Sequence, residues 1–154
     1  MQRVTVPNET LLPEVGRMVQ EGLSVTLRGK GNSMLPFIVS GRDSVVLQKA
    51  DRLQTGDIVL AEIAERHYVL HRIIALDGDR ITLMGDGNLS GTEQCTPCRV
   101  LAKAVRIIRN GCPIDTDSRG ERCKAALWRR LRPMRRWLLA GYRRIERVKG
   151  VMRS

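Results

Sequence analysis

The central part of the chain repeats a pattern that is typical of short β-strands. Six segments rich in β-branched and apolar residues are bounded by Gly, Asp or Asn: LSVTLRG, DSVVLQK, GDIVLAEI, HYVLHRIIAL, DRITLMG and RVLAKAVRII. The segment LDGDR, residues 76–80, also predicts a tight hairpin, because Asp-Gly readily takes positive φ angles. Aromatic residues make up only 3% of the chain, so its core must be aliphatic. We therefore predict a mainly β domain over residues 23–110.

Helical patterns flank this region on both sides. The segment NETLLPEVGRMVQEG carries apolar residues at helical intervals and ends at Gly22, which predicts an N-terminal helix within residues 1–22. From about Cys123 onward, apolar residues recur every three or four positions while arginines fill the other face, so residues 119–154 are predicted to form a basic amphipathic helical tail. Pro133 should divide this tail into two helices or open the second one. At 154 residues, the chain suits one folded domain with appendages.

The excess positive charge lies entirely in the tail. Residues 1–118 hold 14 basic and 14 acidic residues, whereas residues 119–154 hold 13 basic and 2 acidic ones, which gives the net charge of +11. Arginines opposite a Leu/Trp stripe suit an anionic membrane surface bound through residues 120–154. Packing of the same stripe against the β domain is an equally open alternative. Nucleic acid is the least favoured partner, because no recognition motif accompanies the arginines.

The four cysteines do not form a complete metal-binding pattern. They are Cys95, Cys98, Cys112 and Cys123. The first two have the spacing of a metal-binding or redox pair, but no second pair follows, so we predict free thiols and neither a metal nor a cofactor. No signal-peptide pattern is evident, and no apolar run approaches the roughly 20 residues that a bilayer requires. We expect a cytoplasmic protein, attached peripherally at the inner membrane face if the tail binds lipid.

One serine stands in an unusually constrained segment. The stretch GKGNSMLPF, residues 29–37, places Ser33 among glycines and a proline that restrict the backbone. A serine hydroxyl needs a positioned base to act as a nucleophile at neutral pH. Of the two histidines, His67 starts a strand beside charged residues, whereas His71 lies in an apolar strand, where a polar ring requires a partner. From the residues alone, a structural role for a half-buried His71 is favoured over a catalytic one, and Lys30 and Lys49 are the nearest lysines that could act as the base.

Four motifs in the same order resemble one known group of enzymes. GNSMLPF is similar to the Ser-Met-x-Pro box of the signal peptidase I and LexA-like serine peptidases (S24/S26). GDIVLAEI is similar to their Gly-Asp-Ile-Val strand, YVLHRIIAL to the strand with their general base, and LMGDGN to their Gly-Asp-Asn box. The resemblance implies a coiled, mainly β fold and a peptidase that forms an acyl-enzyme.

The resemblance also implies roles for single residues. Ser33 matches the nucleophile, and His71 stands where the bacterial enzymes and LexA carry lysine, which is similar to the Ser-His subgroup of signal peptidases. Asp86 matches the family aspartate and would fix the tautomer of the imidazole, the alternative being a turn-capping residue. Arg72 and Asp57 are expected to be structural, the latter as a turn residue.

The residues around the serine are expected to shape the oxyanion site. They are Gly31, Asn32, Met34 and Pro36. The backbone amide of Ser33 is the leading candidate for an oxyanion donor. Many signal peptidases add a serine hydroxyl two residues before the nucleophile, but this chain has Gly31 there, so a second donor stays unassigned.

Two functions from different classes are compatible with these observations. In the first, the chain is a serine endopeptidase with a Ser-His dyad that matures a peptide or preprotein by cleaving after small residues. Neither a membrane anchor nor a helix-turn-helix domain is evident, and no Ala-Gly or Cys-Gly bond precedes Ser33, which disfavours general secretory cleavage and self-cleavage. In the second, the domain is a non-catalytic interaction module that acts through its basic tail. The oligomeric state is not predicted.

Overall fold

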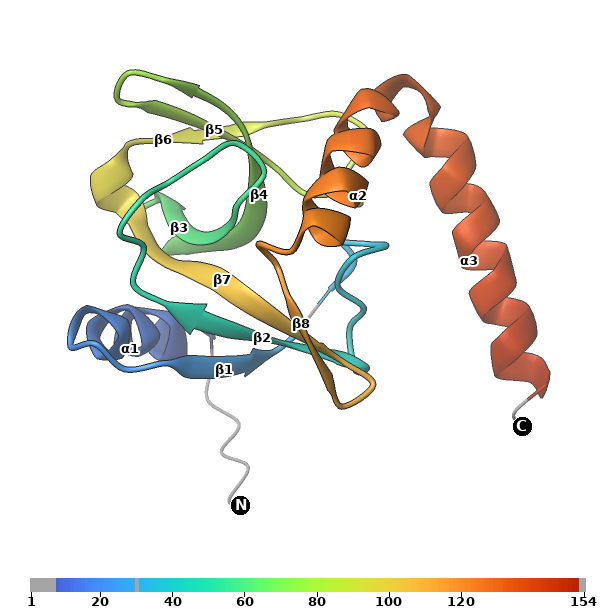
Figure 1. Cartoon of the computed structure of the whole chain (residues 1–154), viewed down its shortest axis with the longest axis horizontal. Coiled ribbons are helices and arrows are strands. Elements are labelled where there is room, and N and C mark those ends of the chain that lie inside the picture. Colours follow the sequence, from blue (N-terminus) through green and yellow to red (C-terminus); the bar gives the residue numbers. More distant parts are fainter. Residues whose placement is uncertain (1–7, 30, 153–154) are drawn as a thin grey trace.

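The computed structural model describes residues 8–29 and 31–152, so the first seven residues of the predicted N-terminal helix and the last two of the tail lie outside it. A single helix precedes the strands, and helices follow them (Figure 1). The elements are α1 (Asn8–Gln20), β1 (Val25–Arg28), β2 (Asp43–Gln48), β3 (Ile58–Ala64), β4 (His67–Asp77), β5 (Arg80–Met84), β6 (Glu93–Cys95), η1 (Pro97–Arg99), β7 (Val100–Arg109), β8 (Cys112–Asp115), α2 (Arg119–Arg130), η2 (Arg132–Met134) and α3 (Arg135–Met152).

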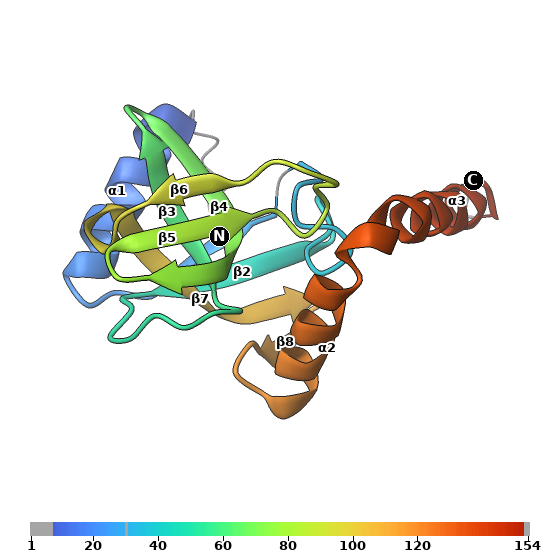
Figure 2. The same ribbon diagram turned by 90° about the horizontal axis from the view of Figure 1, so that it is seen from above.

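All strands belong to one antiparallel sheet. Their order is β1-β2-β7-β3-β4-β5-β6, and β8 pairs with β7 outside this path. Register shifts interrupt the pairing of β3 with both of its neighbours, and also the β2–β7 and β4–β5 pairs. Such bulges bend strands and increase their twist, so the sheet curls around itself, as the two views show (Figure 1 and Figure 2). The predicted coiled, mainly β fold is confirmed.

The core has two parts, one on each face of the central strand β3. Ile58 and Leu60 point into the first cluster, which also contains residues of α1, of the loop after β1 and of β7. Val59 and Ala61 point into the second cluster, together with residues of β4 and β5. Successive side chains of a strand point to opposite faces, so β3 is buried on both sides and fixes the position of its neighbour β4.

Local sequence signals explain where two of the elements end. Gly22, at φ +89°, follows α1, and hydrogen bonds from Gly22 N to Val19 O (3.0 Å) and from Leu23 N to Met18 O (3.1 Å) close the helix in a Schellman motif. In the hairpin between β4 and β5, Gly78 takes φ +56°, as its Asp-Gly sequence predicts.

The C-terminal tail consists of α2 and α3, separated by the short 3-10 helix η2, which contains Pro133. Proline lacks a backbone N–H and disfavours a helical residue before it, which explains the break. Ser118 caps α2 with its side chain, which accepts a hydrogen bond from Glu121 N at 3.4 Å. Among the described residues, neither tail helix nor α1 is both long and apolar enough to cross a membrane.

Candidate active site

The serine lies in the loop that joins β1 to β2. Ser33 is half-buried, Gly31 (φ +74°) and Asn32 are exposed, and Pro36 is half-buried after a cis peptide bond. Met34 is 5% exposed and belongs to the first core cluster. Its carbonyl oxygen accepts hydrogen bonds from the amides of both Phe37 and Ile38 at 3.0 Å. The residue next to the serine is thus anchored in the core.

The backbone of Ser33 packs directly against the turn that follows β5. Gly87 N donates a hydrogen bond to Ser33 O at 2.8 Å. A Cβ atom at Gly85 would clash with the same carbonyl oxygen, and one at Gly87 would clash with the carbonyl of Asn32. This close approach of two loops therefore requires glycine at both positions.

The same turn links the serine loop to the end of β5, which pairs with the strand that carries the histidine. Met84, the last residue of β5, pairs with Arg72 of β4, and Gly85 continues from there to contact Ser33. His71 immediately precedes Arg72. Among the described residues, no hydrogen bond joins the Ser33 hydroxyl to His71. This is common in enzymes without substrate, because catalytic hydrogen bonds often shorten only when substrate binds.

The imidazole of His71 has an acidic partner that the sequence did not indicate. His71 is 5% exposed, and its Nδ1 lies 2.9 Å from Oε2 of Glu93. Leu83 of β5 pairs with Ile73 on one side and with Glu93 on the other, so these three residues form a row across the sheet. His71 stands two residues before Ile73 and points to the same face, which lets the carboxylate reach it across β5.

Sequence reasoning missed Glu93 because β6 has only three residues. A strand of this length is too short to show a period of two, and its register against β5 cannot be obtained from the local sequence. The segment TEQC, residues 92–95, carries no motif that would have indicated an acid for the histidine.

Asp86 has a different partner from the one expected. Its carboxylate accepts three hydrogen bonds from Arg72, from Nε at 2.8 and 3.1 Å and from Nη2 at 2.7 Å, and both side chains are almost fully buried. Arg72 also donates to Gly56 O at 2.8 Å and lies over the ring of Phe37. Adjacent residues of a strand point to opposite faces, so an acid that pairs with Arg72 is placed away from the ring of His71. Here Asp86 and Arg72 form a buried structural pair.

Asp57 occupies the turn before β3, where the sequence placed it. Its carboxylate is 2% exposed and accepts hydrogen bonds from Gln54 N at 2.8 Å and from Arg122 Nη2 at 2.5 Å. Lys103 Nζ lies 3.5 Å from the same carboxylate. Asp57 thus stabilises the turn and ties it to α2.

Comparison with known families agrees with this geometry. The model of the Peptidase S24-like family matches residues 2–105. The chain belongs to the Peptidase S24-like family. This membership places it among serine peptidase-type hydrolases with the LexA-type fold. No curated protein sequence matched the chain.

The S24-like match ends within β7, yet α2 packs on the loops that surround the serine. Trp128 Nε1 donates to Asp86 O at 2.8 Å, and the ring of Trp128 meets Phe37 edge-on, with centroids 6.4 Å apart. Arg135 is 1% exposed, stacks over Trp128 at 5.4 Å and contacts Asn88 O. Burial lowers the pKa of the Arg135 guanidinium. The first half of the tail therefore packs against the domain.

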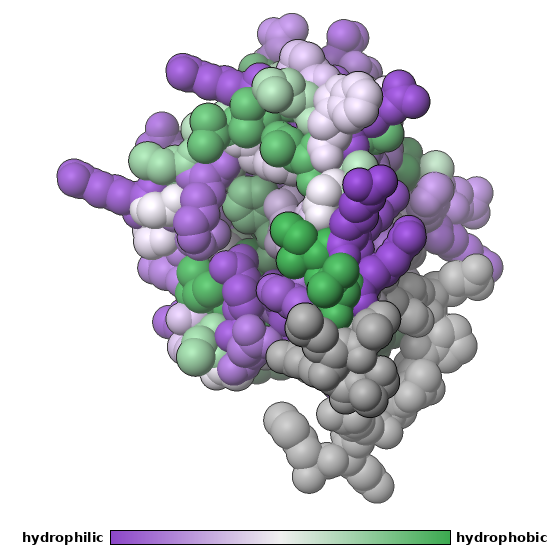
Figure 3. Space-filling view, turned by 90° about the vertical axis from the view of Figure 1, so that its right-hand side faces the viewer, coloured by the Kyte–Doolittle hydropathy of each residue, from purple (hydrophilic) through white to green (hydrophobic). Residues whose placement is uncertain are grey.

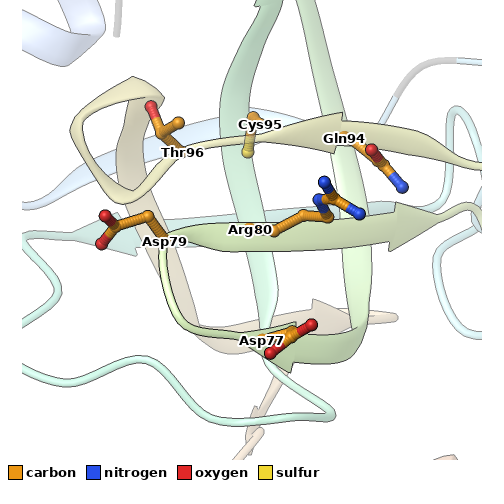
Figure 4. A pocket seen from close by; sticks show the side chains of 6 residues that line it. All are labelled: Asp77, Asp79, Arg80, Gln94, Cys95 and Thr96. Carbon is orange, nitrogen blue, oxygen red and sulfur yellow. The ribbon is translucent and has the colours of Figure 1, made fainter.

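A separate cavity of about 520 Å³ lies at the outer end of β5 and β6 (Figure 4). Its lining side chains are Asp77, Asp79, Arg80, Gln94, Cys95 and Thr96. Neither Ser33, His71 nor Glu93 lines it, so this cavity of the S24-like domain is not the candidate active site. In the part of the chain that the structure describes, no group of three His, Cys, Asp or Glu side chains could hold a metal.

Proposed function

We propose that this chain is a serine endopeptidase in which Ser33 is the nucleophile, His71 the general base and Glu93 the acid that orients the base. The contact between His71 Nδ1 and Glu93 at 2.9 Å carries this proposal. An ionised carboxylate only accepts hydrogen bonds, so the ring nitrogen that faces it, Nδ1, carries the hydrogen and Nε2 is left as the acceptor. The histidine is then in the tautomer that a general base requires.

The proposed reaction follows the chemistry of these groups. Ser33 Oγ attacks the carbonyl carbon of the scissile peptide while His71 Nε2 takes its proton. Glu93 stabilises the imidazolium that forms, and the Ser33 amide donates to the oxyanion. Breakdown of the tetrahedral species breaks the C–N bond, and the leaving amine takes the proton from His71. Water then hydrolyses the ester on Ser33 with the same base.

For the substrate we propose a peptide or preprotein that is cleaved after a small residue. This preference rests on the resemblance of the serine loop and of the histidine strand to signal peptidases of the Ser-His subgroup.

Labelling with a fluorophosphonate probe, together with cleavage of a peptide library, tests the proposal. Ser33→Ala should abolish labelling, and both Ser33→Ala and His71→Ala should lower kcat/KM about a thousand-fold or more. The chain offers matched controls: Ser40 is exposed in the same loop, and His67 is exposed on the same strand. Ser40→Ala and His67→Ala should keep the wild-type rate. Equal labelling and cleavage by all five proteins would instead favour the non-catalytic module.

A further inference from the structure

Helix α3 has one face that is held by the domain. Arg135 and Leu139 are 1% and 3% exposed, and Tyr142 is half-buried. Tyr142 lies near Arg42, in the loop before β2, and near Asp43, the first residue of β2, and burial raises the pKa of its phenol. Residues 135, 139 and 142 are spaced by four and three, so they share one side of the helix. This side fixes how α3 is oriented.

A different side of α3 exposes a stripe of apolar residues. Trp137 is 75% exposed, and Ile145 and Val148 are each 56% exposed. With Gly141 they are spaced by four, four and three residues, so they form a continuous row, which Leu138 (38% exposed) widens. Such a row occupies about a third of the helix surface, and here the domain does not cover it. The domain thus covers Leu139 and Tyr142 on one side of α3 and leaves this row exposed on another.

Positive charge borders this stripe. Arg144 and Arg147 lie along one side of it and Lys149 along the other, and each of the three is exposed. The whole helix holds six basic residues and one acidic residue, Glu146. Figure 1 and Figure 2 show α3 projecting from the sheet. Figure 3 looks at the molecule from the side on which α3 lies in Figure 1, and that surface has hydrophobic residues beside strongly hydrophilic ones. A ligand for this face must bury carbon atoms and carry negative charge.

We propose that α3 binds the surface of an anionic membrane, lying parallel to it with its apolar stripe among the acyl chains. Arginine and lysine side chains at the stripe's edges then reach the lipid phosphates. Tryptophan suits this position, because its ring prefers the boundary between hydrocarbon and headgroups. This surface is independent of the proposed peptidase site, since it uses neither Ser33 nor His71.

Other partners match this face less well. Nucleic acid would neutralise the arginines but leave Trp137, Ile145 and Val148 in water. A second copy of α3 would bury the stripe, but it would bring rows of arginine against each other, and like charges across an interface oppose association. An anionic lipid surface satisfies the charge and the apolar area together.

Sedimentation of the full chain with vesicles tests the proposal. We expect binding to phosphatidylcholine vesicles that contain phosphatidylglycerol at least tenfold tighter than to pure phosphatidylcholine, and weaker binding at high salt. Arg144→Gln should weaken it about five-fold, whereas Arg52→Gln, at an exposed site between β2 and β3, should not. Ile145→Ser should also weaken it, whereas Leu76→Ser, at an exposed leucine near the β4–β5 hairpin, should leave it unchanged.

Tryptophan fluorescence provides a second readout. Anionic vesicles should shift the emission of the wild-type chain to shorter wavelength, and the shift should vanish in Trp137→Phe, which keeps only Trp128. Equal binding to charged and uncharged vesicles, or binding that Ile145→Ser leaves intact, would overturn the proposal. If the chain bound no vesicles, the proposal would also be wrong. Tight binding of duplex DNA would then identify nucleic acid as the partner, and self-association would identify a second copy of the chain.

Discussion

His71 and Arg72 are adjacent in β4, yet their side chains contact different acids. His71 meets Glu93, which is 25% exposed, whereas Arg72 forms a forked pair with the fully buried Asp86. The alternation of side chains along a strand separates the two pairs. The partly exposed carboxylate of Glu93 can stabilise a positive charge that forms on the imidazole of His71. The buried pair of Asp86 and Arg72 mainly fixes the positions of the strand and the turn.

At the residue scale, Glu93→Gln tests whether the acid assists the base. We expect kcat for a peptide substrate to fall about a hundred-fold while KM changes little, because the amide cannot stabilise the imidazolium. Glu93→Asp should recover part of the rate. Gln94→Ala, at the exposed neighbour on β6, is the control. Steady-state kinetics measures kcat and KM, and thermal unfolding checks that each variant is folded.

Asp86→Asn should behave in the opposite way. It leaves the buried guanidinium of Arg72 without a counter-charge, so we expect the free energy of unfolding to fall by about 3 kcal/mol. Glu93→Gln, by contrast, should leave the free energy of unfolding nearly unchanged. Urea unfolding of both variants measures the difference. A Glu93→Gln protein that loses stability but keeps its kcat would give Glu93 a structural role only.

At the scale of elements, the strands with a clear alternating pattern were predicted from the sequence, and two strands without such a pattern were not. The six predicted strands correspond to β1–β5 and β7. β6 and β8 have three and four residues and were missed. Such strands exist because a longer neighbour offers unpaired backbone groups, so their position depends on the sheet and not on their own composition.

Helix α2 should support the active-site loops through Trp128. Trp128→Phe removes the N–H that donates to Asp86 O, and we expect a loss of about 2 kcal/mol in the free energy of unfolding, with a lower kcat for peptide cleavage. The matched control is Trp137→Phe, because Trp137 is 75% exposed. Denaturant unfolding of both variants measures the difference. Equal stability of the two would show that the Trp128 hydrogen bond does not brace the turn.

At the scale of the whole molecule, a truncation within α3 should separate the proposed peptidase activity from the proposed membrane binding. A chain that ends at Tyr142 keeps Arg135 and Leu139 but lacks the exposed residues 143–150. We expect it to unfold within about 1 kcal/mol of the full chain, to cleave a soluble peptide at the same rate and to lose binding to anionic vesicles. Urea unfolding, peptide kinetics and vesicle sedimentation measure these quantities.

A chain that ends at Arg130 is the contrasting control. It also lacks Arg135, which stacks on Trp128, and should be less stable. If the chain ending at Tyr142 lost peptide cleavage, the outer half of α3 would belong to the peptidase site. If it kept vesicle binding, the membrane surface would lie elsewhere.

The sequence by itself determined the strand-rich class, the helices at both ends, the break at Pro133 and the loop that presents Ser33. These features depend on residues that are close in the chain, on their periodicity and on the backbone preferences of Gly and Pro. Only the tertiary structure decided that Glu93 meets His71, that Asp86 pairs with Arg72 and that α2 packs on the serine loop while α3 exposes Trp137. Each of these contacts joins residues far apart in the chain, and strand register and β-bulges, which no local pattern specifies, bring them together.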